Sequence, residues 1–415
     1  MVGDSLRLDE VLASPIEPQF QPIVDLDSMT VVGYEALARW PSAPDVTPAE
    51  VFDHARRIGR LGDLDWECRR AAVVGALGAQ LTRPMSVFIN VEPTTLNSSP
   101  RWPFPTGRFR EITEHDLQII VEFTERDLLV DPASVLYAVD WARDRGCGIA
   151  LDDVGLNPES LALLPLVLPD VVKLDRRILA DPWLPGFDDT VSAVVDYASA
   201  TGAVILAEGI EHADDLGVAR AVGATLGQGY MLGRPGPAPR ETVRPPDHLA
   251  IALIEVLTEP LATPADVLER LPRQVTTYAT IAGVLDSITS IGDELITPGC
   301  IVVAVQNQSS FVDRFAFRYE ELAAKHTLVG VVGVAGLDVP GVRVAGPADP
   351  GFDDQFAVAI LTQTTAATVV ARDLGDSGPL QDRRYAWYFT HSRSAVRDVA
   401  RCLVSRLAPD EPAVR

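Results

Sequence analysis

Eight polar side chains in the first half of the sequence recur at one kind of position, at or near the end of a short apolar run. They are Glu35, Asn90, Glu122, Asp152, Asp153, Lys173, Glu208 and Gln228. A single acid in such a place is usually a helix cap or a loop residue. Helix caps and loop residues do not readily explain why a polar side chain recurs at the end of one apolar run after another. Five carboxylates held together would repel one another, and burying them unpaired would be costly.

Divalent cations would offset this negative charge. The set offers only oxygen ligands, from carboxylates and the Asn90 amide, and it contains no His or Cys. Such ligands favour Mg²⁺ or Mn²⁺ over Zn²⁺. The adjacent acids Asp152 and Asp153 suit two ions about 3.5–4 Å apart, an arrangement that activates water and neutralises a phosphoryl oxygen. The residues therefore indicate metal-assisted hydrolysis of a phosphodiester, with two Mg²⁺ or Mn²⁺ ions.

Apolar runs that alternate with helical patterns must position these side chains. The runs lie at 20–26, 30–37, 86–91, 117–123, 148–153, 170–175, 203–209 and 225–230, and the helical patterns at 48–60, 63–80, 132–145, 188–201 and 212–222. This alternation predicts an α/β fold in which eight strands form one (β/α)₈, TIM-like barrel. Only Asp27-Ser28-Met29 separates the first two runs, so that pair is predicted to be antiparallel. Strand ends meet at one mouth of a barrel, where we expect the eight side chains.

The rest of the chain predicts a second, smaller α/β domain. We expect a lead-in at 1–15, the barrel at 16–238, a Pro-rich linker at 239–248 and the second domain at 249–415. In that domain helical patterns lie at 248–258, 264–271, 275–290, 311–325 and 392–407, and strand-like runs at 300–306, 328–334 and 356–371.

Composition excludes several classes of function. The 58 acidic and 35 basic residues give a net charge of −23, which argues against binding a nucleic-acid polymer or an anionic membrane. No apolar stretch reaches the roughly 18 residues that a membrane span needs. The N-terminus does not resemble a signal peptide, and the four cysteines lie far apart. We therefore expect a cytoplasmic protein without a disulfide framework.

Lysine is rare in this chain. Only Lys173 and Lys325 are lysines among the 35 basic residues. Lys173 lies in the apolar run 170–175, where a buried strand is predicted, and an ammonium is a more compact donor than a guanidinium. We interpret Lys173 as a functional residue; the alternative is a plain salt bridge to Asp175 or another nearby acid.

Ordered motifs over residues 18–237 resemble the EAL-domain cyclic-di-GMP phosphodiesterases. They are Gln21-Pro22, Tyr34-Glu35-Ala36-Leu37-Ala38-Arg39, Asn90, Glu122-Phe123-Thr124-Glu125, Asp152-Asp153-Val154-Gly155, Lys173-Leu174-Asp175, Glu208-Gly209-Ile210-Glu211, Gln228-Gly229-Tyr230 and Arg234-Pro235. The resemblance implies a barrel that opens cyclic-di-GMP to linear pGpG, and it allows for a homodimer through the barrel.

The resemblance also implies a role for each matching residue. Glu35, Asn90, Glu122 and Asp152 would bind one metal, with Asp152 and Asp153 as bridge and ligand of the second. Lys173 would hold the attacking water, and Glu208 would serve at the metal site or as a base. Glu125, Asp175, Glu211 and Gln228 would support the site. Leu37 and Arg39 would contact substrate, Arg39 through a phosphate, and Gln21 and Pro235 would touch guanine.

Two stretches depart from the family pattern. Residues 152–161 read DDVGLNPESL, whereas active members usually read DDFGxGxSSL, and Glu92 replaces a small Ser after the metal-site Asn. An alternative function is therefore a degenerate barrel that binds cyclic-di-GMP without cleaving it. A barrel that serves only as a scaffold for protein contacts is a third interpretation.

The C-terminal region resembles the DICT domain, a sensory module. The matching stretches are Phe315 with Tyr319-Glu320-Glu321-Leu322, the run 330–334 and the strand 385–390. This resemblance implies that an unknown small molecule or protein provides an input that regulates the barrel.

Overall fold

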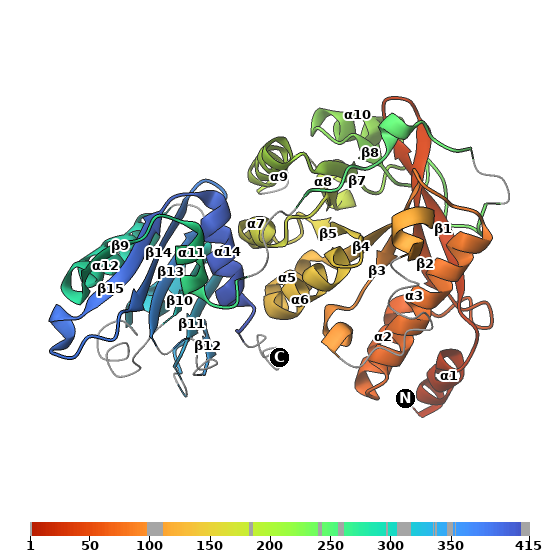
Figure 1. The fold of residues 1–415 in the computed structure, drawn as a ribbon. Coiled ribbons are helices and arrows are strands. Elements are labelled where there is room, and N and C mark those ends of the chain that lie inside the picture. The colour runs from red at the N-terminus through yellow and green to blue at the C-terminus, as the bar shows by residue number, and fades with distance from the viewer. Residues whose placement is uncertain are drawn as a thin grey trace. The chain divides into compact units, whose positions relative to one another are not determined.

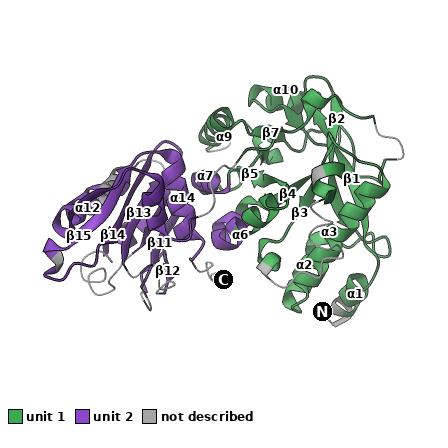
Figure 2. Ribbon diagram, in the orientation of Figure 1, with its two compact units in different colours: residues 1–125, 137–158, 168–255 green, residues 126–136, 159–167, 256–415 purple. Residues whose placement is uncertain are grey.

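The computed structural model contains two compact units (Figures 1 and 2). One comprises residues 1–125, 137–158 and 168–255, and the other comprises residues 126–136, 159–167 and 256–415. The structure describes residues 2–97, 111–181, 186–239, 243–255, 261–295, 298–304, 317–334, 336, 338–346, 352 and 354–407. Within these residues, no helix combines the length and the apolar character that crossing a membrane requires.

The first unit contains a closed eight-stranded barrel, which confirms the predicted fold (Figure 1). Its strands are β1 (Glu17–Asp25), β2 (Thr30–Arg39), β3 (Ser86–Asn90), β4 (Gln118–Thr124), β5 (Gly148–Val154), β6 (Val171–Leu174), β7 (Val204–Ala207) and β8 (Leu226–Gly227). Neighbours from β2 to β8 pair in parallel, whereas β1 is antiparallel to both β2 and β8. The predicted antiparallel first pair is thus confirmed.

Helices lie at the five predicted places, as α2, α3, α6, α9 and α10, and the further helices α1, α5, α7 and α8 were not predicted. Their bounds are α1 (Val2–Leu12), α2 (Pro48–Arg57), α3 (Leu61–Gly78), α5 (Glu125–Val130), α6 (Pro132–Arg143), α7 (Leu164–Val167), α8 (Arg176–Ala180), α9 (Phe187–Thr201) and α10 (Ala213–Ala221). Local chemistry defines their starts. Thr47 and Glu50 form a capping box before α2, with Pro48 in the first turn. Asp131 accepts a hydrogen bond from the Ser134 N–H at the start of α6.

An apolar segment closes the barrel at the end where the parallel strands begin. Leu249, Ile251 and Leu253 pack against the interior cluster that contains Phe88 and Ile120. The Gln118 side chain donates to the Ile251 carbonyl at 2.5 Å, and Asp170 accepts from the Ile254 N–H at 2.6 Å.

The predicted helix at 248–258 is therefore wrong. A single 3₁₀ turn, Asp247–Leu249, is followed by residues 250–255 without helical structure, and residues 256–258 lie outside the described residues. The physical reason is that barrel side chains, rather than the next helical turn, satisfy the backbone groups of this segment. The unit that contains the barrel accordingly extends to Glu255.

The second unit is a seven-stranded sheet between helices (Figure 1). Its strands run in the order β12-β11-β10-β13-β14-β15-β9, and β10, β11 and β12 are parallel neighbours while the other pairs are antiparallel. The bounds are β9 (Gln274–Thr277), β10 (Cys300–Ala304), β11 (Leu328–Val332), β12 (Val342–Ala345), β13 (Gln355–Leu361), β14 (Ala366–Asp373) and β15 (Arg384–Thr390). α11 (Val267–Arg270), α12 (Tyr278–Glu294) and α14 (Arg393–Val404) belong to this unit, and α14 contacts β10, β13 and β14.

Three predicted elements of the second unit differ from the structure. The run 356–371 is two strands, because the Thr362 hydroxyl accepts hydrogen bonds from the N–H groups of Thr364 and Thr365 and turns the chain. The pattern at 275–290 begins as strand β9, and only α12 is helical. The pattern at 264–271 is a 3₁₀ turn followed by the one-turn helix α11. Residues 317–323 are helical, and the first part of the predicted 311–325 helix lies outside the described residues.

Candidate active site

The barrel brings the predicted strand-end residues to one mouth. Asn90, the last residue of β3, is the ladder partner of Glu122 in β4. Glu35 in β2 is the ladder partner of Gln21 in β1. The parallel register of β3 with β4 and the antiparallel register of β1 with β2 thus align residues that are not neighbours in the sequence.

Lys173 lies among four carboxylates. Its ammonium nitrogen is 2.8 Å from Glu122 Oε1, 2.8 Å from Glu208 Oε1, 3.0 Å from Asp152 Oδ1 and 4.0 Å from Glu35 Oε2. The side chains of Lys173 and Glu122 have no exposed surface. A single fully buried cation therefore faces four carboxyl groups.

Amide side chains hold Glu35 from both sides. Asn90 Nδ2 donates to Glu35 Oε1 at 2.9 Å, and Gln228 Nε2 donates to Glu35 Oε2 at 2.7 Å. Gln228 Nε2 also lies 3.1 Å from Gln21 Oε1, and Gln21 donates to the Gly233 carbonyl at 3.2 Å. Gln21 and Gln228 thus belong to the same hydrogen-bonded chain as Glu35.

A bulge in β5 presents both members of the aspartate pair to the same site. The register between β5 and β6 shifts between Leu151 and Val154, and Asp153 has a left-handed φ of 59°. In a regular strand neighbouring side chains point to opposite faces, so Asp152 and Asp153 would diverge. Here one carboxylate oxygen from each of Asp152, Asp153 and Glu208 lies within 4.8 Å of the others.

Glu125 anchors the loop that follows this pair. Its Oε2 accepts hydrogen bonds from Asn157 through the backbone N–H at 2.9 Å and the side chain at 3.4 Å, and its Oε1 accepts from the Gly155 N–H at 3.4 Å. Gly155 has a φ of 108°, and a Cβ there would lie 2.8 Å from Ile178. Asn157, which departs from the family pattern, is therefore a partner of Glu125 in this chain.

Two carboxyl groups near Lys173 hold their protons more tightly than free acids do. Burial, followed by the charges of Asp152 and Glu35, raises the pKa of Glu208 to about 8. Burial, followed by the charges of Asp152 and Asp175, raises the pKa of Asp153 to about 6.

The pKa values of the buried acids Glu122 and Glu35 shift in opposite directions. Burial raises the pKa of Glu122 well above its usual value. Burial would also raise the pKa of Glu35, but the charge of Lys173 and the hydrogen bonds from Gln228 and Asn90 outweigh it and lower that pKa. Burial opposes the charged form of Lys173, yet the surrounding carboxylates raise its pKa well above the usual value.

These residues fit divalent metal ions. The oxygens of Asp152, Asp153 and Glu208 are close enough to share one ion. Glu122 Oε2 is buried, and no described residue donates a hydrogen bond to it. Hard oxygen ligands of this kind match Mg²⁺ or Mn²⁺.

Other residues predicted for the site make contacts of their own or are partly exposed. Asp175 caps α8, where its carboxylate accepts from the Arg177 N–H at 2.9 Å and Arg177 Nε at 3.1 Å. Glu211 is exposed, and its backbone N–H donates to Asp215. The predicted substrate contacts Leu37, Arg39 and Pro235 are partly exposed, and Arg39 donates to the Ala38 carbonyl at 2.9 Å.

Sequence reasoning missed a buried charged pair beside the site. Asp65 and Arg69 in α3 are 1% and 3% exposed and form an ion pair with each other. Their spacing of four residues, with an acid before a base on one helix face, is the signal that would have found the pair.

The chain is similar to several known proteins. The family model described as EAL domain matches residues 7–235, which is more than half of the chain. Two relatives come from Pseudomonas aeruginosa. The cyclic di-GMP phosphodiesterase PA2567 is 32% identical over 221 residues, covering 52% of this chain and 38% of that protein. The cyclic di-GMP phosphodiesterase RocR is 29% identical over 225 residues, covering 53% of this chain and 57% of that protein.

A similar solved structure is the manganese and cyclic-di-GMP complex of Klebsiella pneumoniae BlrP1 at pH 9.0. It is 26% identical and has a TM-score of 0.47, with 54% of this chain and 56% of that chain covered. The chain thus spans less than two thirds of the length of each of these three proteins. The extent of the family match shows that the chain belongs to the EAL-domain family.

Proposed function

We propose that the barrel is a metal-dependent phosphodiesterase that hydrolyses cyclic-di-GMP to linear pGpG. The observation that carries the proposal is the convergence of Asp152, Asp153 and Glu208 within 4.8 Å beside the buried ammonium of Lys173. The names of two relatives, both cyclic di-GMP phosphodiesterases, support the choice of substrate.

The proposed reaction adds one water across one P–O bond. The oxygen of the water bonds to phosphorus, and the ribose oxygen leaves with a proton, which opens the ring and leaves a terminal phosphate. Two bound Mg²⁺ or Mn²⁺ ions would activate the water and neutralise the charge on the phosphoryl group. Glu35, Asn90, Glu122, Asp152 and Asp153 would hold them.

Two residues of the chain would act on the water itself. Lys173 has a compact ammonium that can donate to the water and hold it in line with phosphorus. Glu208 lies 2.8 Å from that ammonium, and its pKa, raised by burial to about 8, lies close to neutral pH, as suits a group that accepts a proton. Arg39, Leu37, Gln21 and Pro235 would contact the nucleotide, with Gln228 and Glu125 supporting the site.

The second unit is proposed to be a sensory domain that regulates the barrel. Its own sheet and core, and the resemblance of its sequence to a DICT domain, support this. We place its start after Glu255, where the unit that contains the barrel ends. Assembly of the barrel into a homodimer and a cytoplasmic location remain predictions.

Incubation of the purified chain with cyclic-di-GMP and Mg²⁺ or Mn²⁺ tests the proposed activity. Chromatography should detect pGpG, and Glu35→Gln should abolish its formation. Glu67→Gln is the matched control, because Glu67 is an exposed acid that pairs with Arg70 on α3. Tight binding of cyclic-di-GMP by the wild type without any pGpG would instead show the receptor function.

A further inference from the structure

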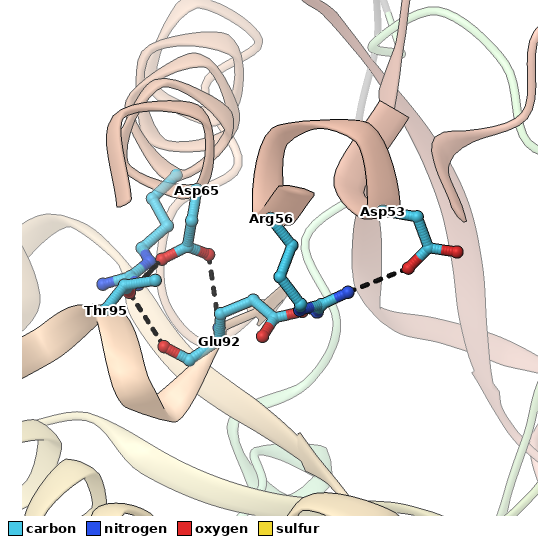
Figure 3. Close-up of polar contacts among 6 residues, drawn as sticks. Asp53, Arg56, Asp65, Glu92 and Thr95 are labelled. Atoms are coloured by element: carbon cyan, nitrogen blue, oxygen red, sulfur yellow. Dashed lines mark hydrogen bonds and ion pairs between the residues drawn. The ribbon is translucent and has the colours of Figure 1, made fainter. Parts of the chain in front are cut away.

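A buried polar cluster lies behind the strand end that carries Asn90. It consists of Asp65 and Arg69 in α3, Thr95 in the 3₁₀ turn Pro93–Asn97, and the backbone of Glu92 (Figure 3). Asp65, Arg69 and Thr95 are 1%, 3% and 4% exposed. The barrel site described above uses none of these three side chains.

The Asp65 carboxylate is hydrogen-bonded to the backbone just after Asn90. Its Oδ1 accepts a hydrogen bond from the Glu92 N–H at 3.2 Å. The Thr95 hydroxyl lies 2.5 Å from Asp65 Oδ2 and 2.8 Å from the Glu92 carbonyl, and it accepts from Arg69 Nη2 at 2.6 Å. One hydroxyl proton can serve only one of the two acceptors. Figure 3 shows Asp65 directed toward Glu92 and Thr95.

Asn90 is held between this cluster and the next strand. The Val91 N–H donates to the Glu122 carbonyl at 3.1 Å, which completes the ladder between β3 and β4. One residue later, the Glu92 N–H donates to Asp65. The backbone is thus fixed on the two residues that follow Asn90, at the point where the strand leaves the sheet.

Burying a charged pair is unfavourable unless a specific geometry repays the lost hydration. Apolar side chains of similar size would pack between α3 and this turn without that penalty. They would not bind the backbone N–H of Glu92, which is partly buried, and the loss of a partner for such a group is itself costly. The polar side chains of the cluster therefore do more than fill space, because they fix the position of the Glu92 backbone.

We infer that Asp65 and Thr95 are positioning residues for the metal ligand Asn90, acting through the backbone of Glu92. The inference rests on the proposed function, because it requires Asn90 to bind a metal ion. Groups that orient a ligand without touching the metal commonly change metal affinity by about 10- to 100-fold when removed.

A second contact to Glu92 provides a matched control. Arg56 donates to Glu92 Oε1 at 2.9 Å and to Asp53 Oδ1 at 2.8 Å, and its side chain is 50% exposed (Figure 3). An exposed ion pair of this kind contributes little. Arg56→Gln removes the contact to the Glu92 side chain while the Glu92 N–H keeps its partner in Asp65.

The experiment measures Mn²⁺ affinity of the full chain by isothermal titration calorimetry without nucleotide, together with the melting temperature of the metal-free protein. Thr95→Val removes the hydroxyl at nearly constant shape, and Thr95→Ser retains it. We expect Thr95→Val and Asp65→Asn to weaken Mn²⁺ binding by about tenfold. Thr95→Ser and Arg56→Gln should remain within about twofold of wild type.

Wild-type Mn²⁺ affinity in folded Thr95→Val, whatever its melting temperature, would overturn the inference. Thr95→Val also keeps the test decisive if Asp65→Asn fails to fold. A wild type that binds Mn²⁺ but does not hydrolyse cyclic-di-GMP refutes the proposed function alone, because the comparison of affinities still holds. A wild type that binds no Mn²⁺ refutes both.

Discussion

The ammonium nitrogen of Lys173 lies 2.8 Å from Oε1 of Glu208. The two residues come from neighbouring strands, Lys173 from within β6 and Glu208 from just after β7. The proposed donor to the water and the proposed acceptor of its proton are therefore in direct contact. Several predictions concern this pair and the acids around it, and each can be measured on the full chain.

Replacement of Lys173 by Arg should lower kcat by at least about a hundredfold, on the scale of losing one positioned electrostatic group. A planar guanidinium is broader than the ammonium that Lys173, itself fully buried, places 2.8 Å from both Glu122 and Glu208. Cyclic-di-GMP binding should change far less. Lys325→Arg is the control, because Lys325 is exposed. An unchanged kcat in Lys173→Arg would make this residue a structural ion-pair partner.

Glu35→Gln and Asp152→Asn should each lower kcat by at least about a hundredfold. Both changes remove a negative charge at a position proposed to bind metal, while the fold should persist because the amide preserves the shape. The measurements are pGpG formation and the melting temperature. Near-wild-type turnover in either variant would show that its carboxylate is not a metal ligand.

Hydrolysis should require Mg²⁺ or Mn²⁺, and Ca²⁺ should inhibit it. Ca²⁺ prefers more ligands at longer distances, which would spread the metal site and misplace the water. Activity should disappear in EDTA and return with added Mg²⁺. Full activity in EDTA or with Ca²⁺ alone would refute the two-metal mechanism.

The stabilisation by Mg²⁺ should be greater at about pH 8.5 than at about pH 6. The pKa values of Asp153 and Glu208 are raised to about 6 and about 8, above the value of roughly 4 for unfolded acids. The folded state therefore binds these protons more strongly, and the metal-free protein loses stability as the pH rises through this range. Because Mg²⁺ binds the ionised carboxylates, it competes with protons at the lower pH.

Differential scanning fluorimetry at both pH values measures this effect as the rise in melting temperature on adding Mg²⁺. Glu208→Gln should reduce the difference between the two pH values. An equal or larger rise at about pH 6 would contradict the assignment of these acids to the metal site.

Ile251→Ala should lower the free energy of unfolding by about 2–4 kcal/mol, because it removes a buried side chain from the segment that closes the barrel. Val243→Ala, in the same connecting stretch but 83% exposed, should change it by less than about 0.5 kcal/mol. Chemical denaturation measures both. Equal effects would show that residues 249–254 do not contribute to the core of the barrel.

The types and order of the proposed ligands could be predicted from the sequence. The barrel strands can be recognised in the sequence as short apolar runs. A parallel barrel brings the ends of its strands to one mouth, so the position of each run end predicts where its polar side chain lies. Glu35, Asn90, Glu122 and Lys173 were predicted to lie together for this reason, and they do. The segment 248–258 was misread because its apolar spacing fits a helix, and local periodicity does not show that a barrel end needs to be closed.

The α/β barrel, its antiparallel first pair and an oxygen-only set of candidate ligands could be predicted from the residues alone, since all three depend on local patterns and residue chemistry. The three-dimensional fold was needed to bring Asp152 and Asp153 to one site, because this requires the bulge and the left-handed backbone of Asp153. It also decided that Lys173 pairs with four acids from other strands rather than with Asp175, which caps α8 instead. Contacts between residues distant in sequence arise from strand register, and register is set by the packing of the whole barrel.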